Sequence, residues 1–234
     1  MYFIDFHTHH YPPDNENILA LYNIDVAQNK AHVQQIIAQK NVLYSIGLHP
    51  WFLENIFFGE RDYGILFYIK EQAHLHQNKI IALGEMGLDK HIENTISKNL
   101  QYSLFQKQIE LAQSIKLPLI LHTVNRFNES LYLLKTAKFK QAVAFHGFNK
   151  KVNIAQMIWQ QQYYTSFGAA IFQSNTAQAS LIQCPKDLLF LETDAQNEYD
   201  IIKIYEKAAF LRKVSVSQLQ AQILENYNRF CTTI

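Results

Sequence analysis

Apolar runs of strand length recur along the whole chain. They are rich in Ile, Leu, Phe, Tyr and Val and lack strict polar alternation, which is typical of strands buried on both faces of a parallel sheet. The pattern predicts strands at residues 2–6, 18–24, 42–48, 79–84, 117–121, 141–145, 163–167 and 188–192.

Segments with a helical spacing of apolar residues lie between most of these runs. The spacing predicts helices at 27–40, 61–77, 97–116, 127–138 and 150–162, and two more at 199–213 and 215–230. Ser215 and Ser217 are suitable N-caps for the last helix. Alternation of strand and helix from end to end predicts an α/β fold, a single (β/α)8 TIM-like barrel domain over residues 1–234.

The connection between the first two runs is unusually short. Residues 10–17 read HYPPDNEN, and parallel strands usually need a dozen residues or more between them. Either an extended loop crosses here, or the second run is not a regular strand. The barrel is therefore expected to be distorted at this connection, with a seven-stranded barrel as the alternative.

Composition narrows the class of protein. Hydrophobic residues make up 48% of the chain and charged residues 18%, an ordinary globular balance, and no apolar stretch is long enough to span a membrane. The N-terminus lacks a signal-like segment, so a cytoplasmic location is expected. Cys184 and Cys231 are too few for a disulfide framework and are expected to be reduced, inert thiols. The net charge of +1 predicts at most a short contact with nucleic acid.

Side chains that bind metals follow several of the apolar runs. The downstream ends of parallel strands open on one face, so residues far apart in the chain can converge there. The set contains imidazoles and carboxylates, which suit Zn, Mn, Fe or Co more naturally than Mg or Ca. It predicts one or two divalent metals and metal-assisted hydrolysis. The candidate ligands are His7, His9, Glu85, His122, His146 and Asp194.

The spacing of the first histidines supports a shared metal. His7 and His9 are one residue apart, so on an extended chain both point to the same side. Asp5 lies on that face and is expected to orient one of the ligands as a hydrogen-bond acceptor. His10 points the other way and is left out of the site.

The remaining candidates each have two interpretations. Glu85 is a costly carboxylate to bury unless it is paired or bound to metal, and its two oxygens suit a bridge between two ions. Asp194 is either a ligand and general base or the cap of the next helix; with the other candidates beside it, we favour the ligand or base. Asp89 is a support or a helix cap. His49, in GLHPW, contacts a substrate phosphate or leaving oxygen, or only packs at the mouth.

The order of these motifs resembles a known family. DFHTH, GLHPW, ALGEMGLD, LHT, FHGF and ETD look like the signature series of the TatD-related metal-dependent deoxyribonucleases, from residue 2 to NYNRF at 226–230. GLHPW and GEMGLD are the most specific pieces, whereas HxH is shared by many metallohydrolases. The resemblance implies a TIM-like barrel, two divalent ions (Zn, Mn, Mg, Fe or Co) and hydrolysis of DNA phosphodiesters, with short or single-stranded DNA as substrate.

The resemblance also implies roles for individual residues. His7 and His9 resemble ligands of one metal, joined by Asp194. Glu85 resembles the bridging ligand. His122 and His146 resemble the ligands of the second metal, and His49 matches a family histidine near the scissile phosphate. The implied catalytic residues are Asp194, Glu85 and His49.

Three departures from the family pattern affect the substrate rim rather than the ligands. Val124 stands where the family usually has Arg, two residues after the fifth-strand histidine. Ala195, Gln196 and Asn197 follow ETD, where a Pro-Tyr-type segment is usual. The early connection is also shorter than usual.

Two alternatives follow from the altered rim and the near-neutral charge. One is a metallohydrolase of the amidohydrolase type acting on a lactone, amide or phosphomonoester. The other is a binding protein with a vestigial site. Amidohydrolases often use a carboxylated Lys as the bridge, and Glu85 in that place favours the TatD type. Neither a membrane nor a protein partner is predicted.

Overall fold

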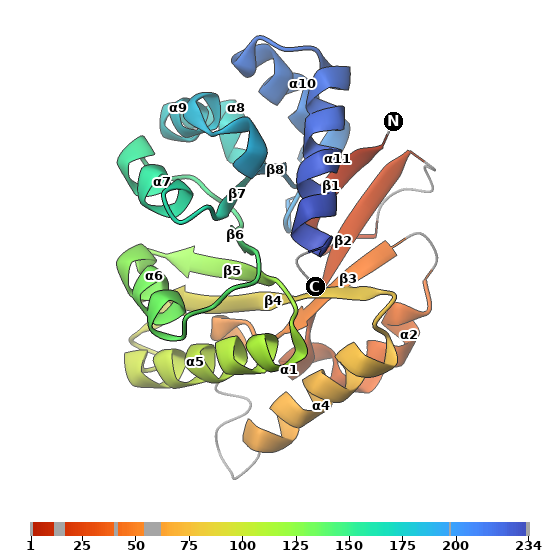
Figure 1. Ribbon diagram of the computed structural model, residues 1–234, viewed down its shortest axis with the longest axis vertical. Helices are drawn as coiled ribbons and strands as arrows, with labels where there is room; N and C mark the ends of the chain where they lie inside the picture. Colours follow the sequence, from red (N-terminus) through yellow and green to blue (C-terminus); the bar gives the residue numbers. More distant parts are fainter. Residues whose placement is uncertain (1, 12–16, 40–41, 54–61, 197, 233–234) are drawn as a thin grey trace. The chain divides into compact units, whose positions relative to one another are not determined.

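The computed structural model describes residues 2–11, 17–39, 42–53, 62–196 and 198–232 (Figure 1). Its chain divides into two compact units. The first unit contains Met1–Tyr22 and Ala144–Thr232, and the second contains Asn23–Val143. Each unit is described by itself below.

All the predicted strands form, including the second run. Every strand pair that the structure describes is parallel. The strands are β1 (Phe3–Thr8), β2 (Ile18–Asp25), β3 (Val42–Gly47), β4 (Ile80–Asp89), β5 (Leu119–Val124), β6 (Val143–Phe145), β7 (Tyr164–Phe167) and β8 (Leu189–Leu191). Strands that alternate with helices in this way make the (β/α)8 fold that the sequence predicts.

The helices follow the predicted segments, with two additional helices between β7 and β8. They are α1 (Val26–Asn29), α2 (Val33–Ile37), α4 (Asp62–Leu75), α5 (Lys98–Ile115), α6 (Phe127–Thr136), α7 (Val152–Trp159), α8 (Ala170–Gln173), α9 (Asn175–Gln183), α10 (Ile201–Arg212) and α11 (Val216–Thr232). Short 3-10 turns lie at η1 (Lys30–His32), η2 (Pro50–Phe52), η3 (Lys90–Ile92) and η4 (Lys186–Leu188). The predicted helix at 27–40 is divided into α1, η1 and α2, and its last residue lies outside the described part of the chain.

The first unit is built on β1 and the strands that pair around it. β1 pairs with β2 from Phe3↔Ile18 onward, and β7 pairs with both β6 and β8. Phe6 of β1 stacks on Phe190 of β8 with ring centres 3.8 Å apart. Phe230 of α11 contacts Phe6 edge-on, with ring centres 5.0 Å apart. These buried rings fix β1, which carries His7, and β8, which precedes Asp194.

The short connection between β1 and β2 does not remove a strand. β2 is a regular strand, so the seven-stranded alternative is wrong. Residues 12–16 of the connection lie outside the described part of the chain. In its described residues, no helix joins the two strands, as expected from its length.

The second unit places β4 between β3 and β5. All ten residues of β4 are buried. Gly84 and Gly87 have φ of +153° and +148°, and a Cβ at either position would collide with the backbone of β5. These glycines therefore permit the close approach that brings Glu85 beside His122.

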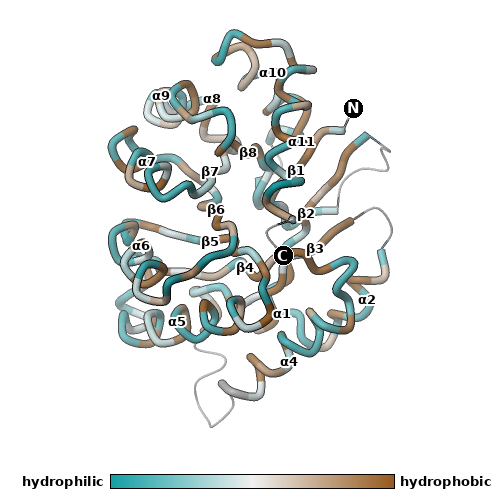
Figure 2. The backbone as a smooth tube through the Cα atoms, in the orientation of Figure 1, coloured by the Kyte–Doolittle hydropathy of each residue, from teal (hydrophilic) through white to brown (hydrophobic). Residues whose placement is uncertain are grey.

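Helix ends follow the expected capping chemistry. The Ser215 hydroxyl accepts a hydrogen bond from the Gln218 N–H at 3.1 Å, and the Gln218 side chain accepts from the Ser215 N–H at 2.9 Å. Asp200 caps α10 by accepting from the Lys203 N–H at 2.9 Å. Figure 2 shows β3 as apolar along most of its length, whereas α7 carries both polar and apolar residues, as an amphipathic helix does.

Two further expectations concern the cysteines and membranes. Cys184 and Cys231 are free, and burial raises the pKa of the Cys184 thiol to about 12. That thiol is therefore inert at neutral pH. Among the described helices, none has the length and apolar character needed to cross a membrane.

Candidate metal centre

The first unit gathers three histidines around Asp194. His7 is fully buried in β1, and its ring centre lies 4.2 Å from that of His146, which follows β6. The Asp194 Oδ1 lies 3.9 Å from His7 Nε2 and 3.6 Å from His9 Nε2. One ligand atom each from His7, His146 and Asp194 lies within 4.8 Å of the others. We call these four residues the Asp194 cluster.

Backbone hydrogen bonds join Asp194 to the end of β1. Its N–H donates to the His7 carbonyl at 2.9 Å, and its carbonyl accepts from the His9 N–H at 3.2 Å. Its φ of +56° is left-handed, which an aspartate tolerates better than most residues. Since Asp200 caps α10, the helix-cap interpretation of Asp194 is wrong.

Asp5 supports this arrangement in a different way from the one predicted. Its carboxylate accepts hydrogen bonds from the Thr193 N–H at 2.9 Å and the Thr193 hydroxyl at 2.7 Å. Burial raises the pKa of Asp5 to about 7, although the two bonds from Thr193 lower it. In the described contacts, Asp5 therefore holds the residue before Asp194 rather than a histidine. His10 is exposed, with its Nε2 3.3 Å from the Ala195 carbonyl, and stays outside the cluster.

The second unit gathers two histidines around Glu85. Its side chain is 3% exposed, and its Oε1 lies 3.1 Å from His49 Nε2 and 2.9 Å from His122 Nδ1. We call these three residues the Glu85 cluster. Burying a carboxylate costs free energy, and the contacts of the two imidazoles with Glu85 offset that cost.

The orientation of His49 is fixed from both sides. Its N–H donates to Asp25 Oδ2 at 2.7 Å, and its Nδ1 accepts from the Trp51 N–H at 3.1 Å. Because Nδ1 accepts, the ring proton of a neutral His49 lies on Nε2 and points to Glu85. Burial raises the pKa of Asp25 to about 6, with the bond from the His49 N–H opposing the rise.

Asp89 is both a support and a cap. Its Oδ2 lies 3.1 Å from His122 Nε2 and accepts from the Trp51 indole at 2.8 Å. Its Oδ1 accepts from the His91 N–H at 2.8 Å and caps η3. Burial alone would raise its pKa, but the bonds from His122, Trp51 and His91 outweigh burial and lower the pKa of Asp89 to about 2.

Two buried polar residues escaped the sequence prediction. Asn23 Oδ1 accepts from the Glu85 N–H at 2.7 Å and from the Ser45 hydroxyl at 3.0 Å, so it fixes the backbone that carries Glu85. Glu192 is fully buried, and its Oε1 accepts from the Gly147 N–H and lies 3.7 Å from His146 Nδ1. Two sequence signals could have identified them. Asn23 is a polar residue inside an apolar run, and Glu192 is the first residue of the ETD motif.

Three candidate ligands lie within strands rather than beyond them. His7 is in β1, which continues to Thr8, Glu85 is in β4, which continues to Asp89, and His122 is in β5, which continues to Val124. The predicted end of β4 at residue 84 was wrong because Gly84 is not a strand end. The glycine instead allows the buried strand to continue past the ligand.

Both clusters fit a divalent metal. Each combines imidazole nitrogens with a carboxylate oxygen; the Glu85 cluster is largely buried, whereas His9 and Asp194 of the other are 34% exposed. Within each unit, one set of three such atoms lies within 4.8 Å: His7, His146 and Asp194 in the first, and His49, Glu85 and His122 in the second. Mixed nitrogen and oxygen ligands suit Zn and related transition metals.

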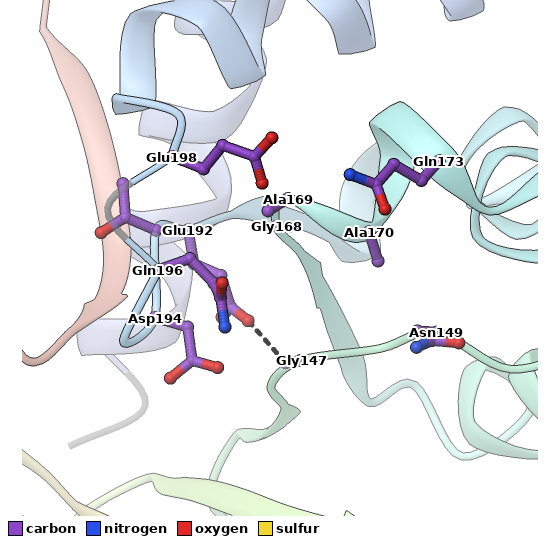
Figure 3. Close-up of a pocket in the computed structure, with 11 residues that line it drawn as sticks. Gly147, Asn149, Gly168, Ala169, Ala170, Gln173, Glu192, Asp194, Gln196 and Glu198 are labelled. Atoms are coloured by element: carbon purple, nitrogen blue, oxygen red, sulfur yellow. Dashed lines mark hydrogen bonds between the residues drawn. The ribbon is translucent and has the colours of Figure 1, made fainter.

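A cavity opens beside Asp194 within the first unit (Figure 3). Its volume is about 290 Å³. Amide side chains and carboxylates line it, together with the backbone around Gly147 and Gly168. We call it the Glu198 cavity; its polar lining side chains are Asn149, Gln173, Glu192, Thr193, Asp194, Gln196 and Glu198.

The one arginine near the end of β5 is paired with carboxylates. Arg126 Nε and Nη2 donate to both oxygens of Glu93 at 2.6 Å, and Nη1 donates to Glu129 at 2.9 Å. Arg126 is therefore not held toward a substrate phosphate in this arrangement.

A (β/α)8 fold that carries buried histidine–carboxylate clusters defines the class of metal-dependent hydrolases. The family model described as TatD related DNase matches residues 4–232, so the chain belongs to that family.

Relatives and solved structures agree with this assignment. An uncharacterized metal-dependent hydrolase of Buchnera aphidicola is 30% identical over 68% of this chain and 58% of that protein. The uncharacterized metal-dependent hydrolase YabD of Bacillus subtilis is 29% identical over 83% of this chain and 80% of its own length. The crystal structure of YjjV, a TatD homologue from Escherichia coli, matches with a TM-score of 0.83 at 23% identity, covering 98% of this chain and 97% of that one.

Proposed function

We propose that this hydrolase cleaves phosphodiester bonds of short or single-stranded DNA with two bound divalent ions, drawn from Zn, Mn, Mg, Fe and Co. The observation that carries the proposal is the Asp194 cluster, where a carboxylate reachable by water lies beside the buried His7 and the half-buried His9. The family match over residues 4–232 supports DNA as the substrate.

We assign the ligands as the family resemblance implies. His7, His9 and Asp194 would hold one ion, His122 and His146 would hold the other, and Glu85 would be the bridging ligand. Bound there, the ions supply an activated water and stabilise the charge that develops on a phosphoryl oxygen.

The protein's own groups position the reaction. The Asp194 side chain is 34% exposed, so it can accept a proton from the attacking water as general base. Asp89 holds the His122 ring from its far nitrogen, a common way of fixing a metal-binding imidazole. His49 directs its Nε2–H to Glu85 and is assigned to the neighbourhood of the scissile phosphate.

The first test replaces the general base. Asp194→Asn keeps the size of the side chain but removes its capacity to accept a proton, so we expect kcat to fall by about 10²–10⁴. Cleavage of a labelled single-stranded oligonucleotide in Mn²⁺ or Mg²⁺ measures this loss.

Asp200→Asn is the matched control, because Asp200 lies outside both clusters and caps α10. We expect it to retain activity and to lose at most about 1 kcal/mol of stability. Metal-loaded wild-type protein without activity on any phosphodiester would overturn the proposal, as would an Asp194→Asn variant as active as wild type.

Hydrolysis of a small substrate is the second candidate. Two observations favour it: Arg126 is paired with Glu93 and Glu129, and no Lys or Arg is among the described residues lining the Glu198 cavity. A panel of chromogenic lactones, amides and phosphomonoesters separates the two functions. Turnover of one of these substrates at a kcat/KM far above that for DNA would select the second candidate.

We also propose that residues 1–234 act as one domain in the cytoplasm. The family match across both units supports the first part, and the two free cysteines agree with the second. A single cooperative unfolding transition of the metal-loaded protein is expected by calorimetry. Two separate transitions would contradict the single domain.

A further inference from the structure

The Glu198 cavity contains a buried acceptor without a partner. Glu192 is fully buried, and its Oε2 has no hydrogen-bond partner among the residues that the structure describes. Its other oxygen is held by the Gly147 N–H, as Figure 3 shows. A buried acceptor that remains unpaired costs free energy, so this side of the cavity favours a ligand that brings a hydrogen-bond donor.

The charge of the cavity excludes a phosphate as that ligand. Glu192, Asp194 and Glu198 line it, and the described lining residues include no Lys, Arg or His. A phosphate would meet carboxylates without a compensating cation. The group that enters is therefore neutral or cationic and rich in donors.

The remaining lining suits a planar group with both donors and acceptors. Asn149, Gln173 and Gln196 offer amides, and Figure 3 shows the Gln173 and Glu198 side chains directed toward each other across the cavity. Amides pair with adenine through one donor and one acceptor, and carboxylates accept from the amine of cytosine. The volume of about 290 Å³ is near the lower end of the range for small-ligand pockets.

The cavity wall is held in place before any ligand enters. Phe172, which precedes Gln173, stacks on Tyr199, which follows Glu198, with ring centres 3.7 Å apart and planes within 3°. This contact ties α8 to the segment before α10. Since Asp194 lines the same cavity, whatever binds there lies next to the proposed reacting centre.

We propose that the Glu198 cavity is a subsite for a nucleobase with an amine at C6 of a purine or C4 of a pyrimidine, that is adenine or cytosine, in the nucleotide beside the scissile bond. This inference rests on the proposed function for the role of the base in cleavage. Thymine presents a carbonyl where adenine and cytosine present the amine, so the cavity disfavours it.

The direct test uses nucleosides, which contain no phosphate and require no turnover. Deoxyadenosine, deoxycytidine and thymidine are titrated into the metal-free protein, and binding is followed by NMR shifts of the side-chain amides. We expect Kd for deoxyadenosine or deoxycytidine to be at least fivefold lower than for thymidine. Equal Kd values, or no binding of any nucleoside, would overturn the subsite.

Two variants test the assignment to this cavity. Glu198→Gln is expected to reduce the preference over thymidine, and Glu198→Lys to abolish it, because the acceptor is replaced by a cation. Glu206→Gln on α10 is the matched control and is expected to keep the wild-type preference. An unchanged preference in folded Glu198→Lys protein would place the nucleoside elsewhere and refute the proposal.

Cleavage of oligonucleotides separates this proposal from the proposed function. Cleavage of DNA with no preference for the base would overturn the subsite and leave the phosphodiesterase intact. Selective binding of nucleosides without cleavage of any phosphodiester would overturn the phosphodiesterase and leave the cavity as a nucleobase site.

Discussion

Asp89 receives donors from three separate segments of the second unit. The His122 ring, the Trp51 indole and the His91 N–H all contact its two oxygens. A carboxylate satisfied in this way is much more stable ionised than protonated. One residue therefore fixes the ring of a proposed metal ligand and the start of η3 together.

These hydrogen bonds make the free energy of unfolding depend on pH in the acidic range. The pKa of Asp89 is lowered to about 2 in the folded protein, below the ordinary 3.8, because its hydrogen bonds favour the charged form. Its stabilisation is therefore complete above about pH 4 and is lost as the pH falls toward 2. Asp89→Asn should reduce the unfolding free energy of metal-free protein by about 1–2 kcal/mol at pH 6, and by less at pH 3.

Urea unfolding in the presence of a chelator, at both pH values, measures the difference. Asp187→Asn is the control, because Asp187 is half exposed and its pair with Arg229 contributes little. Equal stability of Asp89→Asn and wild type at pH 6 would contradict the predicted role.

Strand β4 could be predicted from the sequence only in part. The apolar run and the carboxylate after it were both visible, so the strand and Glu85 could be predicted. The continuation through Gly84 and Gly87 could not, because a glycine in a sequence equally indicates a turn. The contact of these glycines with β5 depends on residues more than thirty positions away.

Helices α8 and α9 could not be predicted for a similar reason. Their sequence, AIFQSNTAQASLIQ, is rich in Ser, Thr, Asn and Gln and has a weak apolar face, so tertiary packing decides its helicity. Of the site, the histidines and Asp194 could be predicted because their motifs are local. Asn23 and Glu192 could not, since their roles come from partners in other strands.

A glycine pair tests the close approach of β4 and β5. Gly87→Ala adds a Cβ that collides with the His122 backbone at a φ that side chains rarely adopt, so we expect a loss of more than about 2 kcal/mol. Gly64→Ala, on helix α4, adds a Cβ with no neighbour within 4 Å and should stabilise the protein by up to about 1 kcal/mol. Chemical denaturation measures both changes. A Gly87→Ala variant as stable as wild type would show that β5 does not require this glycine.

At the scale of the whole molecule, each compact unit contains some of the proposed ligands. His7, His9, His146 and Asp194 belong to the first, and Glu85 and His122 to the second. Hydrogen bonds within each unit hold the backbone beside these residues. In the first, Thr193 donates to Asp5; in the second, the His49 and Glu85 N–H groups donate to Asp25 and Asn23, and Asp89 contacts the His122 ring. Such preorganisation favours tight metal binding, because little ordering remains when the ion enters.

Metal binding should therefore stabilise the folded chain. At a free metal concentration a hundred times Kd, one ion adds about 2.7 kcal/mol, which for a chain of this size raises Tm by roughly 5–10 °C. Elemental analysis is expected to give two ions per chain for wild type, and fewer for His7→Ala or His122→Ala, each with a smaller rise in Tm. His32→Ala is the control, because His32 is exposed on η1 and lies outside both clusters; it should match wild type. Wild-type protein that holds no metal and gains no Tm from Mn²⁺ or Zn²⁺ would instead identify a vestigial site.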